Sequence, residues 1–557
     1  MNENSFASGV RMLKDLLKGL LPEESYRKLR AGCISLRDGL HQSKNRLQLA
    51  FNSNSKEKFD CRTKQFQGIS WRISQNVSPL VAAQENFNLV ESALSDAQIK
   101  WWFVGLDSQQ AISIAVSERD RIFVRHALSR IGEGAPVYAH NWTTDAVLPT
   151  NALRERVEWD ETGVVTIFAP RCFESSSLKY GKELGCQIEF WCFETDSAND
   201  LVLAPRENRA ARILSNLDTK LVLVDSVAGC LPTPEVLNRR MLDDVTFPVD
   251  AVYTWVDGEE PTWIESKRRT EAEIAGVEYH GEANHAARFR SRDELKYSLR
   301  SLEMYAPWFR KIFIVTAGQV PDWLDTNNPK IQLIDHKDIY PESGFLPTFN
   351  SNSIISRLHH IEGLSEHYVY INDDVFFGRA LSKDRFFLPN GIAKVSPSNN
   401  RRPFGDPTAQ DEPHLNLTRN MRTLLEERFG ITISRAIKHT PHPQLRSVHF
   451  EMEEAFREVY EQTWASRFRH HTDIVADQLH HYYAQIVGKA VPTNLRYNYI
   501  NILDDKYKAT MDNTLRLRHR DTFCINDAPV EGATPIPDEL VTEFLDAYFP
   551  VKSSFEK

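Results

Sequence analysis

The sequence predicts an α/β protein in which a mixed sheet is flanked by helices, preceded by a separate N-terminal α+β domain. Two segments, VDAVYTWVDGEEP at 249–261 and YVYINDDVFF at 368–377, have the pattern of buried strands that end in acidic residues. Between them, residues 287–317 combine a helical pattern with a following apolar strand. Alternation of this kind is typical of α/β sheets.

The first of these strands delivers a carboxylate to a loop. Alternating and β-branched residues from Val249 to Val256 favour a strand, and Asp257-Gly258 supply the turn chemistry that ends it. Ligands of open α/β sheets bind at the carboxyl ends of strands, so Asp257 is a candidate for contacting a sugar, a nucleotide or a metal. Taken alone, DGEE is more typical of a solvated turn.

The second strand ends in two adjacent carboxylates, Asp373 and Asp374. Side chains of consecutive strand residues point to opposite faces, so the two can share one ion only if the chain is already turning there, and the nearby Gly378 favours such a turn. Magnesium binds through one or two protein carboxylates plus phosphates and waters. Asn and Asp also end strands for turn reasons alone, but two acidic strand ends in one chain favour a site.

The segment between the two strands predicts a helix with a basic entrance. Leucines at helical spacing from Leu295 to Leu302 form the helix, Pro307 ends it, and 311–316 follows as a strand. Arg288, Arg290 and Arg292 precede the helix, where guanidinium groups and backbone N–H groups suit a phosphate. A solvated basic loop is the alternative interpretation.

Two histidines, His439 and His442, lie on a stretch that prolines interrupt, HTPHPQLRSV, so we expect them on a loop. A helix is predicted over about 448–460, with Arg467 and Arg469 beyond it. Histidine is the side chain best suited to taking a proton from a hydroxyl near neutral pH. Zinc is disfavoured because no third ligand stands at metal spacing.

Composition fits a multi-domain protein of 557 residues with 41% hydrophobic content. A net charge of −9 argues against nucleic-acid binding. Seven scattered cysteines without CxxC spacing indicate reduced thiols, and no apolar run is long enough to span a membrane. We expect a cytoplasmic protein, with peripheral association at the inner face of the plasma membrane left open.

The chain divides into four predicted parts. Residues 1–58 form a helical segment and linker, 59–244 an α+β accessory domain, 245–490 the catalytic domain, and 491–557 a C-terminal extension that packs on it. The accessory domain carries no nucleotide signature, and acceptor recognition, assembly or a passive scaffold all remain open for it.

The chain resembles the Stealth family of sugar-1-phosphate transferases. The blocks that carry the resemblance are DAVYTWVDG, the segment from RFRSRDELKYS to QVPDWL, the segment from LPTFNSNS to YINDDVFFG, and HTPHPQLRSV with the later SRFRHHTD. They cover roughly 247–483. The resemblance implies a glycosyltransferase-A-like catalytic domain, a UDP-sugar donor, a glycan or polysaccharide acceptor, release of UMP, and Mg²⁺ or Mn²⁺ as cofactor.

The resemblance also implies roles for single residues. Asp373 and Asp374 would hold the metal, Asp257 would line the donor site, and His439 would deprotonate the acceptor hydroxyl. The further residues implied are Arg419 and Arg469 at the donor phosphates, with Arg288 and Asn352 as additional donor-site candidates. Some relatives carry Asn in place of Asp257, and spacing alone does not decide between His439 and His442.

Two rival functions stay open. A metal-dependent nucleotide-sugar glycosyltransferase would use similar carboxylates but would release UDP. A non-catalytic polysaccharide-binding or assembly protein would tolerate the loss of His439 and Asp374. A peripheral partnership with the polysaccharide-export machinery is also open.

Overall fold

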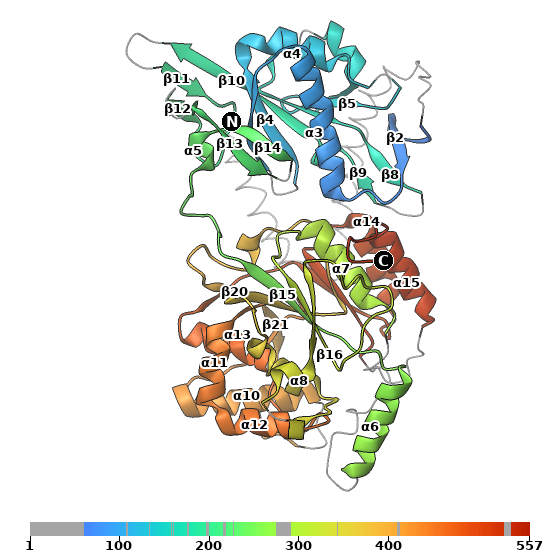
Figure 1. Ribbon diagram of the computed structural model, residues 1–557, viewed down its shortest axis with the longest axis vertical. Helices are drawn as coiled ribbons and strands as arrows, with labels where there is room; N and C mark the ends of the chain where they lie inside the picture. The colour runs from blue at the N-terminus through green and yellow to red at the C-terminus, as the bar shows by residue number, and fades with distance from the viewer. Residues whose placement is uncertain are drawn as a thin grey trace, which may run out of the picture.

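The computed structural model describes residues 61–557 except for 107–109, 133, 157–158, 160, 175–177, 196–199, 216–218, 227, 275–290, 342, 409–412 and 529–535. The predicted N-terminal helical segment and Arg288 lie outside the described residues. Figure 1 shows an upper, N-terminal half and a lower, C-terminal half. Among the described residues, no helix is both long and apolar enough to cross a membrane.

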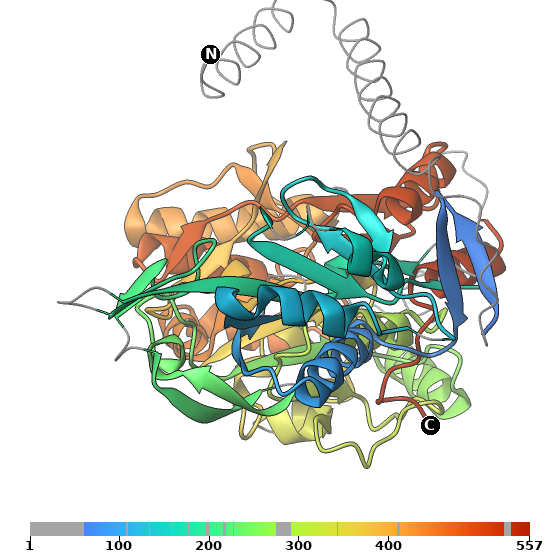
Figure 2. The ribbon, with the colours of Figure 1, turned by 90° about the horizontal axis from the view of Figure 1, so that it is seen from above.

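The N-terminal half is built on a mixed sheet with two helices on one face (Figure 2). Its strand order is β12(Ile213–Ser215), β11(Asp200–Leu203), β10(Cys186–Thr195), β7(Val164–Phe168), β5(Tyr138–Asn141), β6(Val147–Pro149). In addition, β4(Ile112–Ser117) pairs with β10, and β3(Trp101–Leu106) pairs with β4. Helices α3(Pro79–Asp96) and α4(Arg121–Leu128) bury Val90, Leu94 and Val124 against it. Smaller sheets add β1(Thr63–Phe66), β2(Ile69–Ser74), β8(Arg171–Phe173), β9(Lys179–Tyr180), and then β13(Leu221–Ser226), β14(Gly229–Pro234) beside α5(Glu235–Asn238).

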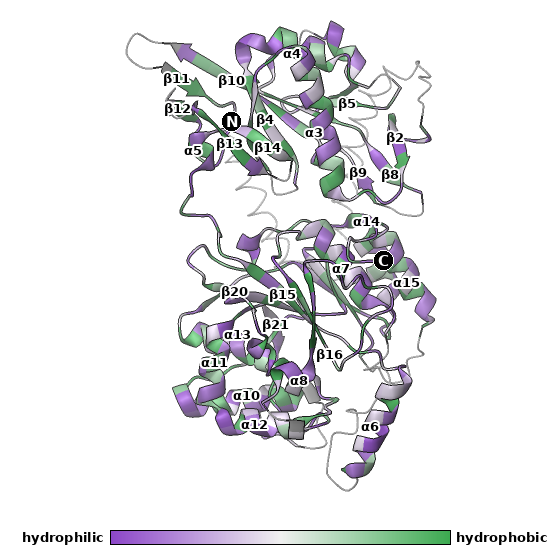
Figure 3. Ribbon diagram, in the orientation of Figure 1, coloured by the Kyte–Doolittle hydropathy of each residue, from purple (hydrophilic) through white to green (hydrophobic). Residues whose placement is uncertain are grey.

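The C-terminal half is built on a sheet of order β17(Ile331–Asp335), β16(Ile312–Thr316), β15(Val249–Thr254), β18(His367–Asn372), β23(His442–Leu445). Within it β17, β16, β15 and β18 are parallel and β23 is antiparallel to β18. This confirms the predicted mixed sheet flanked by helices. Strands β15 and β16 are buried and mainly hydrophobic, whereas α6(Pro261–Glu273) is largely hydrophilic (Figure 3).

Helices α7(Glu294–Tyr305), α8(His336–Ile339), α9(Ser351–Ile355), α10(Pro413–Phe429), α11(Arg446–Ala455), α12(Arg457–Ala465) and α13(Ala476–Ile486) surround this sheet. The prediction of a single helix over 448–460 was wrong in one respect, because the structure has two helices there, which divide at Phe456. Phe456 leaves helical geometry at φ −127° and ψ 36° and is itself buried. The bend lets both Met452 of α11 and Tyr460 of α12 reach the same core.

The predicted strand at 368–377 also divides, into β18 and β19(Val375–Phe377), with Asp373 and Asp374 in the turn between them. The turn satisfies the condition under which two adjacent carboxylates can share a site. Strand β19 belongs to a second sheet of order β19, β26(Thr522–Asn526), β25(Tyr497–Asn501), beside α14(Tyr507–Leu517) and α15(Asp538–Tyr548). Two further pairs join β20(Ala393–Val395) to β24(Ala490–Pro492) and β21(Pro397–Arg401) to β22(Arg435–Ile437).

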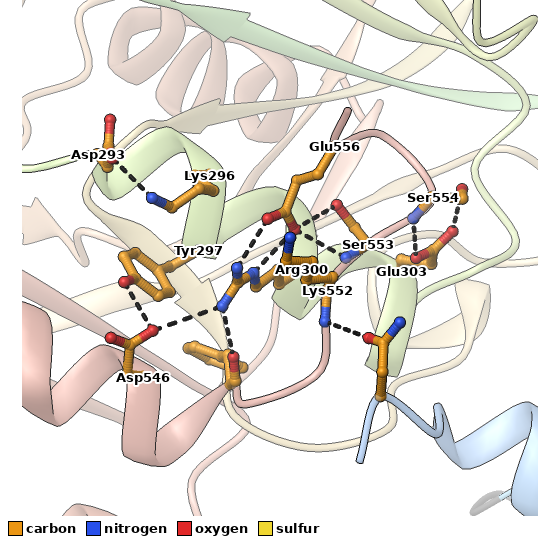
Figure 4. Close-up of polar contacts among 12 residues, drawn as sticks. Asp293, Lys296, Tyr297, Arg300, Glu303, Asp546, Lys552, Ser553, Ser554 and Glu556 are labelled. Carbon is orange, nitrogen blue, oxygen red and sulfur yellow. Dashed lines mark hydrogen bonds and ion pairs between the residues drawn. The ribbon is translucent and has the colours of Figure 1, made fainter. Parts of the chain in front are cut away.

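The two halves share a hydrophobic cluster. Ala82 and Ala83 of α3 pack in one cluster with Met304 of α7 and Leu545 of α15. The chain end is tied to α7 as well, because Glu556 pairs with Arg300 through contacts of 2.8 and 2.7 Å (Figure 4). The C-terminal segment therefore packs against α7 and helps to hold it in place.

Candidate active site

Sheet pairing brings the polar strand ends together. Strands β15 and β18 are parallel neighbours in which Thr254 pairs with Asn372, so Asp257 and the Asp373-Asp374 turn follow at the same edge. Strand β23 runs antiparallel with His442 opposite Tyr370. The residues that precede β23, including His439, therefore lie next to the residues that follow β18.

His439 and Asp374 face one another at this edge. The His439 Nε2 atom lies 3.1 and 3.3 Å from the two carboxylate oxygens of Asp374, and 3.2 Å from the Asn372 side-chain nitrogen. Both side chains remain partly exposed, at 30% for His439 and 20% for Asp374. Burial favours the neutral imidazole, but the carboxylates of Asp374, Asp477 and Asp373 together outweigh this effect and raise the pKa of His439 above its ordinary value.

The neighbouring carboxyl group of Asp373 is strongly perturbed. Burial, together with the Asp374 and Glu294 carboxylates, raises the pKa of Asp373 well above its ordinary value. Two carboxylates held close together in a partly buried turn repel one another, and a divalent cation relieves that repulsion. The pair therefore has the oxygen donors and the charge that suit Mg²⁺.

Sequence reasoning missed Asn526, which lies beside the same turn. Its side-chain nitrogen is 3.5 Å from Asp374 Oδ2, and Ile525 N donates to the Asp374 carbonyl oxygen at 3.1 Å. The sequence did contain a pattern that could have pointed to Asn526. DTFCIND at 521–527 is an apolar run that ends in Asn-Asp, as YVYINDD does. The C-terminal segment was predicted only to pack on the catalytic domain.

The structure separates the two histidines that spacing left equivalent. His442 is buried, with Nδ1 2.6 Å from Asp477 Oδ2 and Nε2 2.8 Å from the Lys438 carbonyl oxygen. Both ring nitrogens of His442 therefore face protein oxygens within the fold. Of the two, His439 has the exposed position and the strand-end neighbours.

The loop that carries Arg469 is held by a buried amide-carboxylate group. Arg469 donates to Ser351 Oγ at 2.6 Å. Asn352 is buried, and its side chain faces Asp473 Oδ2 at 3.5 Å, while Asn350 donates to the same oxygen at 2.8 Å. Asn352 thus lies behind the surface and orders the segment next to Arg469.

Arg419 and Asp257, the remaining predicted residues, are held by contacts of their own. Arg419 of α10 donates to the Asp406 carbonyl oxygen at 3.0 Å. The Asp257 backbone is fixed by Gln319, which accepts from its N–H at 3.1 Å and donates to its carbonyl oxygen at 2.9 Å. Gln319 also lines a cavity of about 240 Å³, together with Trp263 and Phe349, next to the carboxyl ends of β16 and β17.

A second group, His359, His360 and Glu453, places three ligand atoms close enough to share an ion. Both histidine Nε2 atoms lie 2.7 Å from Glu453 Oε2, and Arg357 lies 3.2 Å from the same oxygen. Arg457 pairs with the other oxygen at 3.2 Å. Two guanidinium groups already neutralise Glu453, so these contacts describe a buried ion cluster rather than a cation site.

Four Stealth family models match the chain. They are conserved region 1 at residues 247–275, conserved region 2 at 288–395, conserved region 3 at 438–485 and conserved region 4 at 512–557. The resemblance drawn from the sequence ended near Tyr483, and that limit was wrong, because the fourth region lies in the C-terminal segment and includes Asn526.

Curated relatives cover most of the chain. An exopolysaccharide phosphotransferase of Streptomyces coelicolor is 40% identical over 85% of this chain, which spans about half (51%) of that relative's length. A second one from the same organism is 38% identical over 87% of this chain and 84% of its own length. Exopolysaccharide phosphotransferase CpsY of Mycobacterium tuberculosis is 33% identical over 87% of this chain and 90% of its own.

Solved structures with a partial likeness are glycosyltransferases. The galactosyltransferase LgtC overlaps 54% of this chain and 95% of its own, with 11% identity and a TM-score of 0.28. The apo-form glycosyltransferase GlyE of Streptococcus pneumoniae overlaps 55% of this chain and 62% of its own, with 10% identity and a TM-score of 0.26. The fold itself follows from the strand order given above.

Proposed function

Because this chain belongs to the Stealth family, we propose that it transfers a hexose 1-phosphate from a UDP-sugar to a glycan hydroxyl in exopolysaccharide synthesis. The acceptor oxygen attacks the phosphorus next to the sugar, and the bond from that phosphorus to the bridging oxygen breaks. UMP leaves with the bridging oxygen, and a phosphodiester joins the sugar to the acceptor. The anomeric carbon keeps its oxygen, so its configuration is retained.

One observation carries this proposal. Asp374, His439 and Asn526 belong to family regions 2, 3 and 4 respectively, and Asp374 contacts both His439 and Asn526. Three separate parts of the chain thus bring together a carboxylate, an imidazole and an amide. Phosphoryl transfer depends on holding nucleophile and leaving group in line while charge is neutralised, and a base beside a cation-binding carboxylate suits that task.

In this proposal His439 is the general base. It takes the proton of the acceptor hydroxyl, and the Asp374 carboxylate orients the ring and stabilises the imidazolium that forms. His442 supports His439 from behind, because its pairing with Asp477 anchors the start of β23.

Asp373 and Asp374 would hold Mg²⁺ or Mn²⁺, with Asn526 beside them. The bound ion would supply positive charge to the diphosphate of the donor. Arg419 and Arg469 would bind the donor phosphates as bidentate guanidinium groups, and Asp257 would line the donor site at the end of β15. We assign Asn352 to positioning, because its side chain faces Asp473.

The test is a separation of released nucleotides. The protein is incubated with Mg²⁺, a cell-derived glycan acceptor and a panel of UDP-sugars. UMP together with a phosphodiester-linked product would support the proposal, whereas UDP would identify a glycosyltransferase and overturn it. His439→Gln should slow UMP release by about 10²- to 10⁴-fold. His126→Gln, at an exposed histidine of α4, serves as the matched control.

A further inference from the structure

The N-terminal half contains a cavity of about 630 Å³ between α3 and α4. Its walls are completed by Gly132, Ala135, Pro136, Val137, Ala169 and Arg171. The cavity lies before the first family region begins. Its volume falls within the range typical of ligand sites, roughly 300–1,000 Å³. The candidate active site contributes none of the residues that line it.

One end of this cavity carries excess positive charge. Arg171 is only 4% exposed, and it pairs with Glu85 and donates to Ser74 Oγ at 3.4 Å. Its buried Nε has no acceptor among the described residues. Arg72 is the cross-strand neighbour of Arg171, so two guanidinium groups and one carboxylate, Glu85, line this end of the cavity. Burial and Arg72 both lower the pKa of Arg171. A buried donor without a partner and a cation pair of this kind favour an anionic ligand.

The long walls of the cavity are chemically different from one another. Helix α3 presents Glu85, Asn88, Ser92 and Asp96, at spacings of three and four residues, so they form a polar stripe along the cavity. Eleven residues of helix correspond to roughly 16 Å. Small and apolar residues line most of the rest, including Leu89, Ala93, Ala127, Ile131 and Val137, and Arg130 adds a further cation.

A sugar chain matches both walls, because each ring has hydroxyl groups at its edges and C–H groups on its faces. The arginine end adds a place for one anionic group between sugars. Glu85 is also one helical turn from Ala82, which belongs to the cluster shared with the C-terminal half. The arginine end therefore lies closer to the catalytic half than the opposite end of the cavity at Asp96.

We propose that this cavity binds a segment of phosphodiester-linked glycan, with a phosphodiester group on Arg72 and Arg171 and the adjoining sugars along α3. The choice of ligand rests on the proposed function, since an enzyme that joins sugars through phosphate makes a chain of this kind. The accessory half would then hold the growing acceptor, while the strand edge of the C-terminal half carries out transfer.

The experiment measures binding to the full chain without donor or turnover. Isothermal titration calorimetry uses a synthetic trisaccharide joined by phosphodiesters, the same hexoses joined by glycosidic bonds, and inorganic phosphate. We expect the charged trisaccharide to bind at least tenfold more tightly than either comparator. Arg72→Ala, which removes an exposed side chain, should weaken its binding at least tenfold, and Ser92→Trp should occlude the cavity.

The matched control is Arg154→Ala, an exposed arginine of the same half that does not line the cavity. Three results would overturn the inference. The neutral trisaccharide or inorganic phosphate could bind as tightly as the charged trisaccharide, or Arg72→Ala could leave the binding of the charged trisaccharide unchanged. If the charged trisaccharide binds but no UMP is released, the cavity assignment stands and the proposed function fails. If UMP is released without such binding, the cavity assignment fails alone.

Discussion

Asp473 provides a sharp test of how the loop next to Arg469 is held. Its side chain is fully buried, and Oδ2 accepts from Asn350 at 2.8 Å and from the His470 N–H at 2.9 Å. Oδ1 has no donor among the described residues. Burial raises the pKa of Asp473 to about 6, even though these hydrogen bonds act in the opposite direction. The perturbation is Asp473→Asn.

The magnitude follows from the difference between the folded pKa of about 6 and the ordinary value of 3.8. Each pKa unit corresponds to about 1.4 kcal/mol, so ionised Asp473 costs the folded state about 3 kcal/mol. The folded pKa is the higher one. The stability contributed by the protonated carboxyl is therefore fully present below about pH 4 and is lost as the pH rises through 6.

An asparagine at this position is neutral at every pH, and its amide oxygen can keep the two hydrogen bonds. We expect the free energy of unfolding of Asp473→Asn, relative to the wild type, to rise by about 3 kcal/mol between pH 4 and pH 8. Urea unfolding followed by tryptophan fluorescence at several pH values gives this difference. Asp512→Asn, an exposed position on α14, should show a flat difference. A flat difference for Asp473→Asn would refute the reasoning.

Three further predictions concern the site and its supports. His439→Gln should lower the transfer rate by about 10²- to 10⁴-fold with little change in melting temperature, because the residue is partly exposed, and a variant with near-normal kcat would exclude it as the base. His442→Phe should destabilise the fold by roughly 3–5 kcal/mol, because it leaves the Asp477 carboxylate buried without its partner, and denaturant unfolding measures the loss. Glu556→Ala should cost about 3 kcal/mol, since Arg300 is then left buried, and an unchanged unfolding midpoint would show that the chain end is not an anchor.

Local pattern was enough for the elements on which the site is built. The strands at 249–254 and 367–372 and the helix at 294–305 follow from β-branched runs, leucine spacing and turn residues. The Asp373-Asp374 pair was recognisable because acidic residues ended an apolar run. Each of these features depends on residues a few positions apart, and side-chain sterics and hydrogen bonding act over that range.

Local sequence pattern did not predict which residues of the site contact one another. His439 and His442 differ by three positions, yet one faces Asp374 and the other Asp477, 35 residues further along the chain. Asn526 reaches Asp374 across 152 positions because β26 pairs with β19. The sequence alone therefore determined the strands, the helix and the kinds of groups that end them. Only the tertiary structure decided which of those groups meet, because strand partners are selected by burial of whole faces and not by any nearby residue.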